Sequence, residues 1–181
     1  MEYLYKISNL QEYAIKTAQE YAEMLIYTAV CFFLPMFLGH NQILVGTAVN
    51  ALLILAALNV KGYKLLPIIL APSLGAFAGG LIFGPFTIYL LYLIPFIWIG
   101  NTILVFSFKY FKLKLNKNYL FTSIIGAFAK SGFLFLSAFL LYSFGIIPGV
   151  FLFAMGAMQL ITAVSGGIAA YGAQAVKRKY F

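Results

Sequence analysis

The chain has 181 residues, of which 64% are hydrophobic and only 9% are charged. Water-soluble domains carry about 25% charged residues, so this composition excludes an ordinary soluble protein and indicates an integral membrane protein. The length suits a single membrane domain over residues 1–181, without a separate soluble module. The net charge of +8 lies mostly in short segments between apolar runs, which indicates membrane topology and not a nucleic-acid-binding surface.

Residues 1–20 place apolar and charged side chains on opposite sides at near-helical spacing, which predicts an amphipathic N-terminal helix. Six apolar runs follow, each close to the ~20 residues that a membrane-spanning helix needs. They cover about 21–39, 42–60, 65–83, 86–108, 119–144 and 149–176. The predicted fold class is an all-α membrane protein, a bundle of six transmembrane helices with an N-terminal amphipathic extension.

Lysine and arginine occur in alternate connections between these runs. Lys61 and Lys64 lie between the second and third runs, four lysines between Lys109 and Lys117 separate the fourth from the fifth, and basic residues close the chain. The other three connections carry none. The positive-inside rule therefore places both termini in the cytoplasm, and we expect a multi-pass protein of the cell (plasma) membrane, with the lipid bilayer as its surroundings.

One lysine, Lys130, lies near the middle of the fifth run. At ~1.5 Å per residue it is roughly 16 Å from one end of the run and about 20 Å from the other, and a stem of about 6 Å reaches neither membrane surface. All four carboxylates of the chain are glutamates within its first 23 residues, so none is expected inside the membrane. Either the amine loses its proton, or hydrogen-bond acceptors hold it, or an anionic ligand supplies the missing charge.

Three amide side chains are expected at a similar depth. Counted from the outer ends of their runs, Asn50 is about 12 Å deep, Gln159 about 15 Å, Lys130 about 20 Å and Asn101 about 22 Å. The alternative for each of them is a purely structural role, because a buried amide can link two helices by a hydrogen bond without contacting a ligand. Their shared depth with Lys130 favours a binding site formed by four helices.

Aromatic side chains lie between this depth and the outer end of the bundle. Tyr89 and Tyr92 belong to the outer half of the fourth run, and Trp98 is one turn from Asn101. His40 begins a polar turn, residues 40–42, at the predicted mouth. Aromatic rings with a few directed polar groups suit a planar heterocyclic ligand, although an interfacial aromatic belt would show the same composition.

Residues for catalysis are absent from the sequence pattern. His40 is the single histidine, so neither a multi-histidine metal site nor an acid–base pair inside the membrane is expected. Ser165 is roughly 24 Å down the sixth run and too far from His40 for nucleophilic catalysis. The segment GAFAKS, residues 126–131, lacks the second glycine of a phosphate-binding loop. We expect no enzyme activity, no metal and no cofactor.

Small residues recur every fourth position in three segments, a spacing that lets helices approach closely in lipid. The third run contains Ala71, Gly75 and Gly79, and the sixth contains Ser165, Ala169 and Ala173; both series predict packing within the bundle. The first series is Ala14, Ala18 and Ala22. Because it crosses the expected cytoplasmic boundary, we expect it to face a partner protein.

With its size, six crossings, cytoplasmic termini and the spacing of Ala14, Ala18 and Ala22, the chain resembles the S components of energy-coupling factor (ECF) vitamin transporters, their substrate-binding membrane subunits. The resemblance implies capture of a small water-soluble nutrient, a vitamin or similar heterocycle. It also implies two kinds of partner, a transmembrane coupling subunit that docks on the alanine series and ATPase subunits that drive uptake. A secondary transporter or channel, and a non-catalytic structural subunit of a membrane complex, are the alternatives.

Depth in the membrane and helical face suggest roles for individual side chains in such a pocket. Lys130 would bind an anionic or carbonyl group of the ligand, while Asn50 and Gln159 would line its polar edge, and Asn101 is a further substrate-binding candidate. Stacking would fall to Tyr89, Tyr92 and Trp98, and the loop around His40 would occlude the pocket. Which nutrient binds, and in what oligomeric state, is left open by the sequence.

Overall fold

The computed structural model describes residues 2–80 and 82–177, and its regular elements there are all helical. The helices are α1 (Glu2–Ser8), α2 (Thr17–Leu38), α3 (Gln42–Asn59), η1 (Gly62–Lys64), α4 (Leu65–Gly79), η2 (Gly84–Tyr89), α5 (Leu90–Ser107), η3 (Phe108–Lys114), α6 (Tyr119–Ser143), α7 (Val150–Met155) and α8 (Ala157–Lys177). They form six spans long and apolar enough to cross a membrane, which confirms the predicted fold class. The protein is a multi-pass α-helical membrane protein.

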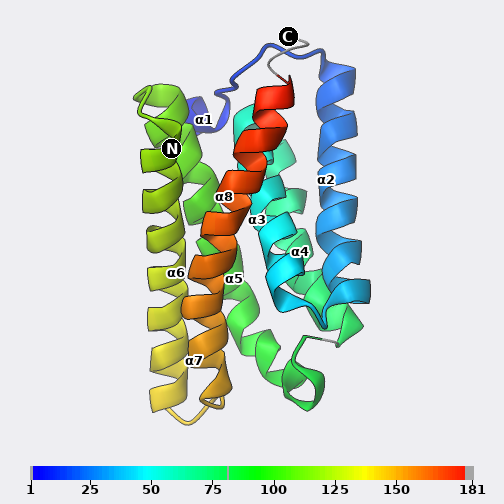
Figure 1. Cartoon of the computed structure of the whole chain (residues 1–181), viewed down its shortest axis with the longest axis vertical. Helices are drawn as coiled ribbons and strands as arrows, with labels where there is room; N and C mark the ends of the chain where they lie inside the picture. The colour runs from blue at the N-terminus through cyan, green and yellow to red at the C-terminus, as the bar shows by residue number, and fades with distance from the viewer. Residues whose placement is uncertain (1, 81, 178–181) are drawn as a thin grey trace.

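The six spans bring the beginning and the end of the chain to the same end of the bundle (Figure 1). The lysine-containing connections η1 and the end of η3 lie there too, so we call it the charged end. The opposite, uncharged end contains the turn at residues 39–41, the rim segment of residues 82–89 and the connection from α6 to α7 at residues 144–149. This segregation of charge is what the alternating connections predicted.

The N-terminal helix is much shorter than the predicted range of 1–20. Helix α1 ends at Ser8, residues 9–16 are not helical, and α2 begins at Thr17. Tertiary hydrogen bonds explain the break: the backbone N–H of Glu12 donates to the carbonyl of Leu58 at 2.8 Å, and the buried ammonium of Lys109 donates to the carbonyl of Leu10. Residues 9–16, the N-terminal strap, therefore run across the charged end instead of continuing a helix.

Helix α2 lies at the edge of the bundle and packs closely on α4. A Cβ atom added at Gly75 would lie 2.0 Å from the backbone oxygen of Phe32, and one at Gly79 would lie 2.3 Å from that of Met36. No larger residue fits between these two backbones without separating the helices. The close contact predicted for the third run is confirmed.

Helices α3 and α8 also approach closely, but on a different face of α8 from the one predicted. A Cβ atom at Gly166 would lie 2.7 Å from the Cβ atom of Asn50, whereas Ala169 and Ala173 are exposed. The predicted series Ser165, Ala169 and Ala173 is therefore wrong as a packing face. Glycine permits a closer approach than alanine, so the glycine face of the helix is the one that packs.

All four glutamates are engaged at the charged end. Glu20, 1% exposed, accepts a hydrogen bond from the Lys64 ammonium at 2.6 Å. Glu12 accepts one from the Gln174 amide at 2.8 Å. Ion pairs join Glu2 to Lys6 and Glu23 to Lys177. The negative side chains of this protein are thus committed far from the middle of the bundle.

Candidate functional site, a polar cavity around Lys130

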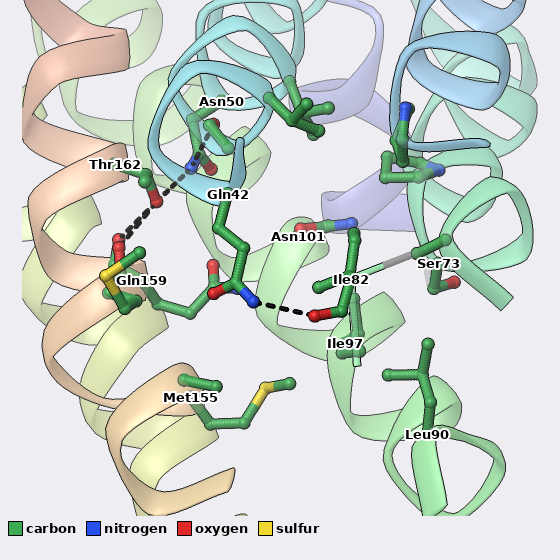
Figure 2. A pocket seen from close by; sticks show the side chains of 18 of the residues that line it. Gln42, Asn50, Ser73, Ile82, Leu90, Ile97, Asn101, Met155, Gln159 and Thr162 are labelled. Atoms are coloured by element: carbon green, nitrogen blue, oxygen red, sulfur yellow. Dashed lines mark hydrogen bonds between the residues drawn. The ribbon is translucent and has the colours of Figure 1, made fainter. Parts of the chain in front are cut away.

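A cavity of ≈ 110 Å³ lies between the middle of the bundle and its uncharged end (Figure 2). Residues from α2, α3, α4, α5, α6, α7 and α8 line it. Four of its polar lining residues are those predicted from their depth in the membrane: Asn50, Asn101, Lys130 and Gln159. The structure therefore brings together, on four different helices, the predicted lysine and all three predicted amides.

The deepest polar contact in the cavity joins Lys130 to Asn50. Lys130 is only 2% exposed, and its Nζ atom donates a hydrogen bond to Oδ1 of Asn50 at 2.6 Å. The Asn50 amide nitrogen donates to the Gly46 carbonyl at 2.9 Å and to the Thr162 hydroxyl at 3.2 Å. These two bonds hold the amide so that its oxygen faces the lysine, and the close approach at Gly166 makes the contact between α3 and α8 possible.

Lys130 has no carboxylate partner among the described residues. The residues next to it along α6 are uncharged, and the four glutamates bond to other groups at the charged end. A lysine ammonium has three N–H donors, and Asn50 is the one protein acceptor within hydrogen-bond distance in the described part of the chain. The Lys130 amine therefore keeps unused hydrogen-bonding capacity at the cavity, and the described wall residues include no carboxylate that would balance a positive charge on it.

The opposite wall is formed by polar groups that already have partners. Asn101, 1% exposed, donates to the carbonyl of Ile69 at 2.9 Å. Ser73 donates to the carbonyl of Leu70 at 3.1 Å and accepts from the indole nitrogen of Trp98 at 2.8 Å. Trp98 is thus absent from the cavity wall and instead orients Ser73, which is part of it.

The other predicted aromatic residues are also absent from the cavity wall. Tyr92 is 54% exposed on the outside of the bundle, and His40 is exposed in its turn. Tyr89 packs against Phe151, with ring centroids 6.4 Å apart. Helix α5 presents Leu90, Ile97 and Asn101 to the cavity, so Tyr92, on another face of the helix, points outward. Among the described residues, Phe83 is the single aromatic member of the wall.

Three polar wall residues were not singled out as ligand contacts: Gln42, Ser73 and Thr162. Gln42 begins α3, and its amide donates to the carbonyl of Ile82 at 2.9 Å, across the uncharged end of the cavity (Figure 2). Thr162 lies one helical turn from Gln159, a signal that the sequence contains. Nothing in the sequence marks Ser73, because its contribution depends on how α4 packs against α5.

The sixth span is interrupted beside the cavity. Helix α7 ends at Met155, Gly156 has non-helical backbone angles of φ −96° and ψ −94°, and α8 begins at Ala157. Met155, Met158 and Gln159 all line the cavity, so the break at Gly156 lies beside it.

The alanine series predicted to face a partner does not form one helical stripe. Ala18 and Ala22 are exposed on α2, whereas Ala14 is exposed in the N-terminal strap and lies outside the helix. The three side chains are accessible, but the regular spacing exists only in the sequence. The helix that would have carried it is broken by the tertiary bonds of the strap.

The fold and this site together define the class of protein, a multi-pass α-helical membrane protein with a polar cavity that contains a buried lysine. Comparisons with protein-family models, with curated proteins and with solved structures give no match for the chain.

Proposed function

We propose that the protein captures a small water-soluble nutrient in the cavity around Lys130, as the substrate-binding subunit of an ATP-driven transporter of the ECF type. The observation that carries this proposal is the buried amine of Lys130, which lines a cavity whose described wall residues include no carboxylate. An ionisable side chain inside the membrane is costly, and such residues usually mark the path or the site of a substrate. A bound ligand would supply the missing interactions.

Access to the cavity is proposed from the uncharged end. Gln42 and Ile82 close that end with one hydrogen bond of 2.9 Å, and Phe83 lies beside them in the wall. One such bond contributes about 0.5–1.5 kcal/mol, little enough for the rim segment to open and close on binding. The positive-inside rule orients the uncharged end toward the outside of the cell membrane and the charged end toward the cytoplasm.

The proposed partners are the transmembrane coupling subunit and the ATPase subunits that the sequence resemblance implies. Helix α2 supports such docking because it lies at the edge of the bundle (Figure 1), and Ala18 and Ala22, close to its first residue Thr17, are exposed. The window of α2 that could span the membrane is only 11% buried within the chain. Lipid or a neighbouring subunit must cover the rest of the apolar surface of α2.

Ligand binding by purified protein tests the proposal. The protein is placed in lipid nanodiscs and titrated with a panel of water-soluble nutrients, using calorimetry to detect binding. Lys130→Met should abolish binding of whichever nutrient is found. Lys117→Met is the matched control, since Lys117 is exposed at the charged end, and it should bind as the wild type does. Equal affinity of wild type and Lys130→Met would remove the cavity from the function.

One observation favours a second candidate function, secondary transport without ATPases. Discontinuous spanning helices whose ends face a substrate are common in secondary transporters, and the sixth span is interrupted at Gly156 beside the cavity. Uptake of the identified nutrient into liposomes distinguishes the two functions. Uptake driven by an ion gradient with this protein alone supports a secondary transporter, and uptake only when ATPase and coupling subunits are present supports the ECF type.

A further inference from the structure

We infer that the ligand of the cavity is a small aliphatic monoanion, a molecule with one carboxylate and a mainly saturated carbon body. This inference rests on the proposed function, because it assigns a chemical class to the nutrient bound at Lys130. It also departs from the planar heterocycle that the aromatic residues of the sequence suggested. Three features of the cavity carry it: its charge, the state of its polar groups, and the composition of its wall.

The charge of the cavity calls for one negative group. Among the described residues, Lys130 is the single member of the wall that can carry a charge. Its ammonium form would repel a cationic ligand. A neutral ligand would leave the ammonium without a counter-ion in a medium of low dielectric constant, whereas one carboxylate balances it with charge-assisted hydrogen bonds. A second carboxylate would have no cation to pair with.

The remaining polar groups limit how many hydrogen bonds the ligand can make. Asn101, Ser73 and Thr162 already donate to backbone carbonyls at 2.9, 3.1 and 2.8 Å. Lys130 has donors to spare, and the side-chain amide of Gln159 has no protein partner among the described residues. The cavity therefore offers an anchor at Lys130. Its further polar contacts are the Gln159 amide and the amide oxygens of Gln42 and Asn101, whose amide nitrogens already donate to backbone carbonyls.

The rest of the wall is aliphatic or thioether. Val45, Val49, Ile97, Met155 and Met158 surround the space between Lys130 and the rim segment. Aromatic and heteroaromatic ligands gain affinity from rings that stack on them, and here the single wall ring is Phe83 at the rim. The volume of ≈ 110 Å³ is below the ~300–1,000 Å³ of pockets for drug-sized ligands. A short saturated chain matches both the surface and the size.

Matched probes that differ in one property test the inference. Pentanoate, its neutral analogue pentanamide and the cation pentylammonium share one carbon chain, while benzoate and pyridine-3-carboxamide represent aromatic bodies with and without the charge. Each is titrated by calorimetry into protein in nanodiscs of zwitterionic lipid. The variants are Lys130→Met, Lys130→Arg, which keeps the cation, and Lys117→Met as the control. Thermal unfolding confirms that each variant is folded.

We expect pentanoate to bind at least tenfold more tightly than the other four probes. That preference should disappear in Lys130→Met and persist in Lys117→Met. Lys130→Arg should bind pentanoate more tightly than Lys130→Met, which separates loss of charge from loss of fold. Tighter binding of a neutral or aromatic probe that still depends on Lys130 would overturn the inference and leave the proposed function intact. Absence of binding by all five probes would also overturn the inferred ligand class. The titration with the nutrient panel would then test the proposed function separately. Equal binding of pentanoate to wild type and Lys130→Met would refute both.

Discussion

Replacing Asn50 by aspartate places a carboxylate where the ligand's charge is proposed to bind. Aspartate and asparagine have nearly the same shape, so the new carboxylate oxygen would stand 2.6 Å from the ammonium of Lys130, the distance at which Oδ1 of Asn50 now lies. The substitution gives Lys130 an internal counter-ion. It also removes the amide donor that bonds to the Gly46 carbonyl and the Thr162 hydroxyl.

The expected effect on binding follows from electrostatics. A bound carboxylate about 4 Å from the new aspartate would be repelled by about 4 kcal/mol at an effective dielectric constant of 20. Since each 1.4 kcal/mol changes affinity tenfold, the dissociation constant for a monoanion should rise about a thousandfold. The fold should change less, because the new ion pair offsets the loss of two hydrogen bonds worth about 0.5–1.5 kcal/mol each.

Calorimetric titration of Asn50→Asp with pentanoate, beside thermal unfolding of the same sample, measures both effects. Asn50→Ser is the control, since it shortens the side chain without adding charge, and we expect its affinity to remain within about tenfold of wild type. Anion binding by Asn50→Asp within tenfold of wild type would refute the placement of the ligand's charge at Lys130. Tighter binding of pentylammonium to Asn50→Asp would show that charge, and not shape, governs this end of the cavity.

Three further predictions concern the rim, the packing and the strap. Gln42→Ala removes the bond that closes the rim and should speed ligand release up to about tenfold, measured by stopped-flow fluorescence. Gln42→Glu tests whether the release rate depends on a charge at this position or on the contact with the rim segment. Gly75→Ala places a Cβ atom 2.0 Å from the backbone of Phe32, so we expect a thermal unfolding temperature several degrees lower, whereas Gly132→Ala, at an open position, should have little effect. Lys109→Met removes the side-chain nitrogen that holds the strap, so amide hydrogen exchange in residues 9–16 should accelerate. Ligand affinity at the cavity should stay unchanged. Unaltered exchange would contradict the strap's dependence on this lysine.

Some of the site could be read from the sequence because depth in a membrane follows from helix geometry alone. A rise of ~1.5 Å per residue sets the height of each polar side chain, and Lys130, Asn50, Asn101 and Gln159 do line one cavity. The aromatic contacts could not be read in the same way. The depth in the membrane would allow ligand contacts by Tyr89, Tyr92 and Trp98. The rotation of α5 about its axis, however, directs other side chains to the cavity.

At the charged end, too, the sequence did not reveal which polar groups are buried or which partners they bond to. The sequence places Lys109 in a short basic connection, where a solvent-exposed side chain is expected, yet its side chain is fully buried and bonds to the carbonyl of Val60 at 2.7 Å. The N-terminal residues have helical periodicity, yet residues 9–16 form a strap. In both cases backbone groups from distant parts of the chain provide partners that local periodicity does not reveal.

By itself, the sequence determined that six apolar spans form, and at what height Lys130 lies without an acidic neighbour. It did not determine that the fourth span continues to Lys114 or that the sixth is interrupted at Gly156. Only the tertiary structure decided that Asn50 is its partner and that the wall around it is aliphatic. The physical reason is that helix length and polarity are local properties of the chain, governed by backbone hydrogen bonding and transfer into lipid. Which side chains meet depends instead on how closely the helices approach, and here glycines such as Gly166 set that distance.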